Sequence, residues 1–262
     1  MTVSNVLGVL KTAYRCQVQE FRLRPHYCYT IVGQPVLYMA FSVLLFRHTG
    51  RSQQIPYYLI SASLIGVWNA NLFTSATIVE RERRDGTLLF IVASPTDVVW
   101  VLLGRSLANS TLSLTSVVAS FSIAVKIAGG VATVKDFPLI LGCLFLTVIA
   151  VTVLGLWVGC MFVLFREAQR LAVLLCWPVY ILSGVMLPRT SLPPVCRVVG
   201  YALAPTWGLR GLQSCIGGQN SVSFVEVAAA LCALTCLYFV CAYRSYNLVV
   251  RRIQKEGRMA EW

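Results

Sequence analysis

Charged side chains are scarce in this chain. Of its 262 residues, 12% are Asp, Glu, Lys or Arg, whereas 57% are hydrophobic. Ordinary soluble domains carry about 25% charged residues. A chain with so little charge lacks the polar surface that a sizeable soluble domain needs, so composition places it in a lipid bilayer.

Motifs of common enzymes and metal sites are also missing. The sequence has no G-x-x-x-x-G-K-[ST] phosphate loop, no H-E-x-x-H, no G-x-S-x-G and no C-x-x-C pair among its ten cysteines. We therefore expect no catalytic residue, metal or cofactor on this chain. Cys196 and Cys215 fall in a predicted external loop, and a disulfide between them is an alternative that spacing alone does not decide.

Long apolar runs, by contrast, recur along the whole chain. Because about 20 apolar residues cross the hydrocarbon of a bilayer, we predict an all-α membrane protein that forms a single domain over residues 1–262. The six predicted spans cover about residues 27–46, 55–79, 98–125, 137–165, 171–187 and 222–243. An amphipathic helix over 4–24 precedes them, with Lys11 and Arg15 opposite its apolar face, and we expect it to lie among the lipid headgroups.

Basic residues predict the orientation of the spans. Six spans place both termini on one side, and Lys and Arg collect at the cytoplasmic ends of spans. With both termini in the cytoplasm, 15 of the 22 basic residues lie inside, as expected for a multi-pass protein of the cell membrane. The basic tail at 244–262 is expected to contact anionic lipids, so the net charge of +12 does not predict a nucleic-acid partner.

A dense run of charge joins the second and third predicted spans, within a region at 80–97. Gly86 allows a sharp turn after the run, and a short helix is predicted over about 87–92. Mixed signs favour ion pairing with a protein surface over attraction to anionic lipid, although a solvated loop is the alternative. The residues expected to couple to a soluble partner are Glu80, Arg81, Glu82, Arg83, Arg84, Asp85, Gly86, Thr87 and Leu88.

This stretch resembles the membrane subunits of ABC exporters of the type-2 permease class. In that family the second and third spans are joined by an acidic-basic-acidic run, a Gly-Thr-Leu, a Ser/Thr-Pro and a further glycine. The matching segments here are Glu80-Arg81-Glu82, Gly86-Thr87-Leu88, Ser94-Pro95 and Gly104, with Leu89 where the family often has Glu. The resemblance covers almost the whole chain.

A second family-like segment follows the fifth predicted span. It reads Ser183-Gly184-Val185-Met186-Leu187-Pro188, then Leu192-Pro193 and Pro205-Thr206. The resemblance implies a re-entrant region over 188–218 and an outer gate formed by Ser183, Gly184, Pro188 and Pro193; a plain extracellular loop is the alternative. Broken backbone at membrane depth needs a protein-lined or watery environment.

Polar residues also mark the predicted spans. They serve either a transport pathway or helix packing, since Ser and Thr are routine donors between membrane helices. These residues are Asn71, Ser75, Asn109, Ser113, Ser116 and Ser120. Gly155 and Gly159 favour close helix packing, within one subunit or between two.

The resemblance implies an exporter subunit that pairs with a second permease copy, identical or related. Two P-loop ATPase subunits, which carry the ATP and Mg, would dock on the charged connection. The expected substrate is amphipathic or hydrophobic: a lipid, a glycolipid or polysaccharide, a drug or a secondary metabolite. No formal charge lies in the middle of a predicted span, so we expect no site for a small, strongly charged ion. A lipid-modifying membrane enzyme and an ion-coupled carrier are the alternatives.

Overall fold

A computed structural model describes residues 3–23, 29, 33–48, 55–72, 86, 98–128, 137–162, 168–186, 192–215 and 223–256. Within these ranges every long element is an α-helix, so the all-α prediction is confirmed for them. The helices are α1 (Val3–Leu23), α3 (Gln34–His48), α4 (Ile55–Ala70), α7 (Val98–Ala128), α8 (Phe137–Phe162), α9 (Ala168–Leu182), α10 (Pro194–Tyr201), α11 (Ala204–Cys215) and α12 (Phe224–Glu256).

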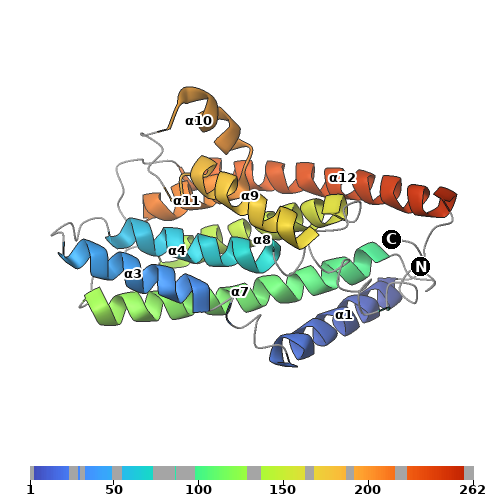
Figure 1. Ribbon diagram of the computed structural model, residues 1–262, viewed down its shortest axis with the longest axis horizontal. Coiled ribbons are helices and arrows are strands. Elements are labelled where there is room, and N and C mark those ends of the chain that lie inside the picture. Colours follow the sequence, from blue (N-terminus) through green and yellow to red (C-terminus); the bar gives the residue numbers. More distant parts are fainter. Residues whose placement is uncertain are drawn as a thin grey trace.

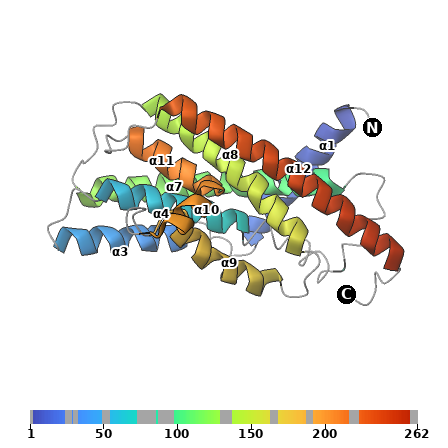
Figure 2. The same cartoon turned by 90° about the horizontal axis from the view of Figure 1, so that it is seen from above.

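The long helices run along the long axis of the molecule (Figures 1 and 2). Helix α8 packs against α12 and α11, while α7 contacts α1, α3, α4 and α8. The first turn of α1 and the last turn of α12 lie toward the same end of the molecule (Figures 1 and 2). An even number of passes after α1, with α12 counted as the last, would produce this arrangement.

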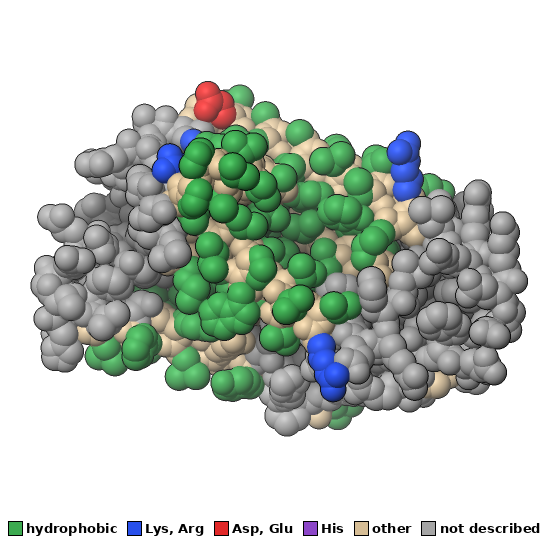
Figure 3. All heavy atoms as spheres, turned by 45° about the horizontal axis from the view of Figure 1, so that its top comes forward, with side chains coloured by type: hydrophobic (Ala, Val, Ile, Leu, Met, Phe, Trp, Pro, Cys, Tyr) green, Lys and Arg blue, Asp and Glu red, His purple; other side chains and the backbone are tan. Residues whose placement is uncertain are grey.

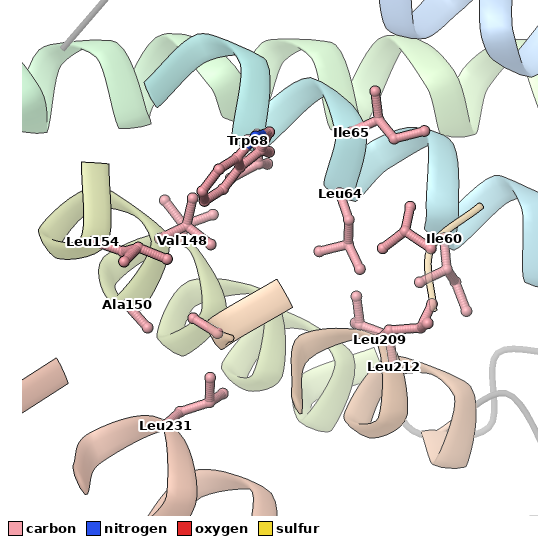
Figure 4. Close-up of a cluster of buried hydrophobic side chains, with 14 of the residues drawn as sticks. Ile60, Leu64, Ile65, Trp68, Val148, Ala150, Leu154, Leu209, Leu212 and Leu231 are labelled. Carbon is pink, nitrogen blue, oxygen red and sulfur yellow. The ribbon is translucent and has the colours of Figure 1, made fainter. Parts of the chain in front are cut away.

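The core lies where α4, α8, α11 and α12 meet. Side chains from all four helices converge there, including Leu64 of α4, Leu154 of α8, Leu209 of α11 and Leu231 of α12 (Figure 4). All four side chains are buried. The core therefore fixes the short helix α11 against α8 and α12.

The outward faces of several helices are also apolar. Phe41, Phe145, Leu174 and Leu237 are each more than half exposed, and they lie on α3, α8, α9 and α12. Figure 3 shows hydrophobic side chains across the middle of one face, with the described charged side chains around its margin. Such a surface is suited to contact with lipid hydrocarbon.

Two described helices are long and apolar enough to cross a bilayer, over Pro138–Met161 and Phe224–Ser245. Shorter apolar helices cover Ile60–Ala70 and Arg170–Leu182. Helices α3, α4, α7, α8, α9 and α12 occupy the six predicted segments in order. Six complete spans stay a prediction, because parts of these segments lie outside the described residues.

The ends of several elements differ from the predictions. The fifth segment was expected to reach 187, but α9 ends at Leu182 because Gly184 adopts a left-handed φ of 80° that stops the helix. The sixth predicted span, 222–243, agrees with the apolar part of α12 at Phe224–Ser245; the helix itself continues to Glu256, because Arg, Lys and Gln are good helix formers. Prolines of the 188–218 region lie where one helix gives way to the next, with Pro194 at the start of α10 and Pro205 in the first turn of α11.

The alternative of a disulfide between Cys196 and Cys215 is wrong, since both are free thiols. Cys196 lies near the start of α10, where it is only partly buried. Cys215 is the last residue of α11 and packs against the hydrophobic core. The two thiols therefore belong to different surroundings.

Candidate functional site

A buried polar cluster joins α4, α7 and α8. Asn71 follows the last turn of α4, and its Nδ2 donates to the Val67 carbonyl at 2.9 Å. The Ser110 hydroxyl of α7 lies 3.1 Å from Asn71 Oδ1 and also hydrogen-bonds with Thr152 of α8. All three side chains are buried. Each such bond between membrane helices contributes about 0.6 kcal/mol on average, so the cluster stabilises the packing of three helices.

Gly155 explains how the cluster is packed so closely. A Cβ atom at Gly155 would lie 3.2 Å from Asn71 Cβ, tighter than an ordinary carbon contact. The glycine therefore lets α8 approach the end of α4. Of the two alternatives for Gly155, the structure shows packing within one subunit.

A second polar cluster joins α9 to the bundle through Asn69. Asn69 Nδ2 donates to Gln34 Oε1 of α3 at 3.3 Å, and its Oδ1 accepts a hydrogen bond from the Tyr180 hydroxyl of α9. The Cys176 thiol of α9 lies 3.8 Å from the same oxygen. Several residues of α9 expose large apolar side chains, including Leu174 and Trp177. Asn69 is thus a polar tether for a helix with much of its surface outside the core.

Helix α1 is attached closely to α7. A Cβ at Gly104 of α7 would lie 2.8 Å from the Leu10 carbonyl oxygen and 2.9 Å from Ala13 Cβ, so only glycine allows this approach. The Tyr14 hydroxyl lies 2.9 Å from Thr111 Oγ1. Arg105 of α7 lies 3.8 Å from the Glu20 carboxylate in a largely buried ion pair. These contacts make α1 and α7 one packed unit.

The segment after α9 turns back through the short helices α10 and α11. Ser183, Gly184 and Val185 are all buried, and Gly200 of α10 packs on the Leu182 backbone. Thr206 Oγ1 donates to the Gly200 carbonyl at 2.6 Å. The Tyr238 hydroxyl of α12 donates to the Ala202 carbonyl at the corner between the two helices. Hydroxyl groups of α11 and α12 thus hold the corner through its backbone carbonyl groups.

A scan against protein-family models matches residues 9–216 to the ABC-2 type transporter family. The chain belongs to the ABC-2 type transporter family. This ABC-2 chain is the membrane domain of an ABC-type transporter, and its apolar helices fit that role. The family typically pairs with ABC ATPase partners. No curated protein is similar enough to the chain to count as a relative.

The structure brings together only some of the residues predicted for the ABC-2 site. Asn71, Asn109 and Ser113 are buried inside the subunit, and Ser113 Oγ donates to the Ser110 carbonyl at 2.7 Å. The side chains of Ser116 and Ser120 of α7 lie outside the described residues, as does Ser75. A role for these residues in lining a transport pathway stays a prediction.

The charged connection of this ABC-2 chain is described at one residue. Gly86 is exposed and adopts a φ of 72° in a turn, a conformation that glycine reaches at little cost. The predicted coupling residues Glu80, Arg81, Glu82, Arg83, Arg84, Asp85, Thr87 and Leu88 lie outside the described residues. Of the predicted outer gate, Ser183 and Gly184 are buried, Pro193 precedes α10 with its side chain exposed, and Pro188 lies outside the described residues.

Sequence reasoning missed Ser110, Thr152 and Tyr180 as members of the polar clusters. Ser110 could have been found, because it lies one residue after Asn109 and one turn before Ser113 on the same helix. Thr152 stands in a helix that is apolar on every side, so no periodic pattern marks the face it occupies. In the part of the chain that is described, no three His, Cys, Asp or Glu side chains gather as metal ligands would.

Proposed function

We propose that this chain is the permease subunit of an ATP-driven exporter. The observation that carries the proposal is the ABC-2 match over residues 9–216 on a chain whose sequence contains no phosphate loop. ATP and Mg would then bind to separate P-loop ATPase subunits. The energy of ATP binding would favour one permease conformation over another only if the ATPase contacts differ between the two.

The coupling surface for these ATPases is the charged connection around Glu82 and Arg84. Helix α7 begins at Val98, shortly after this connection, and α7 carries α1 with it through the close contact at Gly104. A push on the connection would therefore move α1 and α7 together. The tight α1–α7 packing supports this route.

The termini would face the cytoplasm of the cell. The first turn of α1 and the last turn of α12 lie toward one end of the molecule (Figure 1). Lys11, Arg15 and Arg22 are exposed on α1, and Arg244 is exposed on α12, as the positive-inside tendency favours. Helices α10 and α11 would then form a re-entrant gate in the outer half of the membrane, since Gly211 of α11 packs on Cys143 near the start of α8.

The substrate would be amphipathic or hydrophobic, such as a lipid, a lipid-linked glycan, a drug or a secondary metabolite. A second permease copy, identical or related, would complete the pathway. Helix α9 exposes a wide apolar surface outside the core. Such a surface is stable when lipid, the substrate or the second permease copy packs on it, and this supports the proposal.

Transport into inverted membrane vesicles tests the proposal. Vesicles that hold the chain with its co-expressed ATPase should accumulate a fluorescent amphipathic probe when ATP is supplied, and a protonophore should not stop them. The Glu82→Lys/Arg84→Glu variant should lose this uptake while it still inserts. Uptake driven by a proton gradient without ATP would indicate a carrier, and turnover of a lipid by the isolated chain would indicate an enzyme; either result would contradict the proposal.

A further inference from the structure

An arginine of α11 is stacked against two aromatic rings. The guanidinium carbon of Arg210 lies 5.2 Å from the Tyr201 ring centroid and 5.2 Å from the Trp207 ring centroid. The rings themselves are 5.6 Å apart, and Trp207 Nε1 donates to the Tyr201 carbonyl at 3.0 Å. This hydrogen bond ties the end of α10 to α11, so the two rings and the cation form a preorganised group.

The packing of α11 against α8 sets the depth of this arginine. Gly208 lies against Thr147 and Gly211 against Cys143, so α11 runs antiparallel to α8. The apolar span of α8 begins at Pro138. At about 1.5 Å per helical residue, Cys143 and Thr147 lie roughly 7 and 13 Å inside that end. Arg210 comes between Gly208 and Gly211 and is therefore about 10 Å below the end of the span.

The depth of Arg210 falls within the hydrocarbon. An arginine there normally extends toward the headgroups or pairs with an acidic group. Arg210 instead stacks on Trp207, which lies one turn deeper on α11. Within the described part of the chain, no ion pair is formed by Arg210. Cation–π stacking leaves the N–H edge of the guanidinium free to donate hydrogen bonds.

Helix α10, whose Tyr201 stacks on this cation, also exposes apolar side chains. Val195 and Val198 of α10 are 72% and 69% exposed, and Val199 and Tyr201 are also exposed. Figure 1 shows α10 standing out from the rest of the bundle. A guanidinium stacked on the last residue of a helix with exposed aliphatic side chains matches a molecule with an anionic head and a hydrocarbon chain.

We propose that Arg210, held by Tyr201 and Trp207, binds the phosphate of an amphipathic molecule whose hydrocarbon chain lies along α10. Arginine suits phosphate because its planar fork donates two parallel hydrogen bonds. The inference rests on the proposed placement of the α10–α11 corner in the outer half of the membrane. The molecule bound at Arg210 is therefore a phosphate-bearing amphipath. It is either a phospholipid of the bilayer or the transported molecule.

The test uses the full chain in lipid nanodiscs and two photoactivatable probes. One is a phosphatidic acid with a diazirine in its acyl chain, and the other is the diacylglycerol with the same chain and no phosphate. Cross-linked peptides from α10 and α11 are quantified by mass spectrometry. We expect about tenfold stronger labelling by the phosphate probe, a fall to the diacylglycerol level in Arg210→Gln, and no change in Arg244→Gln, which removes an exposed arginine of α12.

Equal labelling of the wild-type chain by the two probes would overturn the inference, and this comparison needs no variant to fold. Unchanged labelling in a monodisperse Arg210→Gln would overturn it as well. With the ATPase present, labelling that falls during ATP turnover identifies the phosphate as that of the transported molecule, whereas steady labelling identifies a resident phospholipid; both results support the site. Absence of any ATPase would contradict the proposed function but leave the probe comparison intact.

Discussion

The contact at Gly104 allows the sharpest prediction about the fold. Alanine at this position would place a methyl group 2.8 Å from the Leu10 carbonyl oxygen and 2.9 Å from Ala13 Cβ. Carbon atoms in contact normally lie about 3.5–4.0 Å apart. Because one neighbour is backbone and the other a short methyl, neither can rotate away. Helix α1 must therefore shift away from α7 by roughly 0.5 Å or more.

Gly8 of α1 provides a matched control. Alanine there meets nothing within 4 Å, so Gly8→Ala gains only the helix preference of about 0.8–1.0 kcal/mol. Gly104→Ala gains the same amount but overpacks the interface, which typically costs about 1–3 kcal/mol. The free energy of unfolding of the two variants should therefore differ by about 1–3 kcal/mol, with Gly104→Ala the less stable.

Thermal unfolding in one mild detergent, followed by far-ultraviolet circular dichroism, measures this difference. At about 2–4 °C per kcal/mol for a chain of 150–250 residues, we expect Gly104→Ala to unfold roughly 2–12 °C below Gly8→Ala. Equal midpoints, or a higher midpoint for Gly104→Ala, would refute the close α1–α7 contact. The same variant should weaken ATP-driven transport if α1 and α7 move as one unit.

Three further predictions follow from other contacts. Tyr180→Phe should lower the free energy of unfolding by about 0.6–1.7 kcal/mol, because it removes the hydrogen bond to Asn69; an unchanged melting midpoint would argue against the tether to α9. Gly184→Ala should cost about 1–2 kcal/mol, since φ is 80° there; a neutral effect on the same midpoint would show that the turn relaxes. Glu82→Lys/Arg84→Glu should weaken ATPase binding in a pull-down but leave membrane insertion intact, whereas full assembly of the complex would exclude a docking role.

Apolar run length and helical spacing were sufficient to predict most helices. The expected amphipathic helix over 4–24 corresponds to Val3–Leu23, and the expected third span over 98–125 lies within Val98–Ala128. Long runs give such agreement because hydrophobic periodicity is a strong local signal. Helix ends were less predictable, as Gly184 and the continuation of α12 show, because caps depend on single residues.

The α10–α11 pair could not be predicted in detail from its prolines. Proline can either end a helix or occupy its first turn, so its presence alone does not say where a helix begins. The backbone shows that Pro194 and Pro205 are in the first turns of α10 and α11. The depth of Arg210 depends on which residues of α8 lie against α11. That tertiary contact is made by Gly208 and Gly211. No local pattern in the sequence carries that information.

The measurement that tests the central claim most directly is a mild-detergent purification of this chain from its native membrane, with mass spectrometry of the proteins that accompany it. The account predicts a stoichiometric partner whose sequence contains a P-loop, together with a second permease chain, identical or related. Repeated purification of the well-folded chain alone would contradict an ATP-driven exporter.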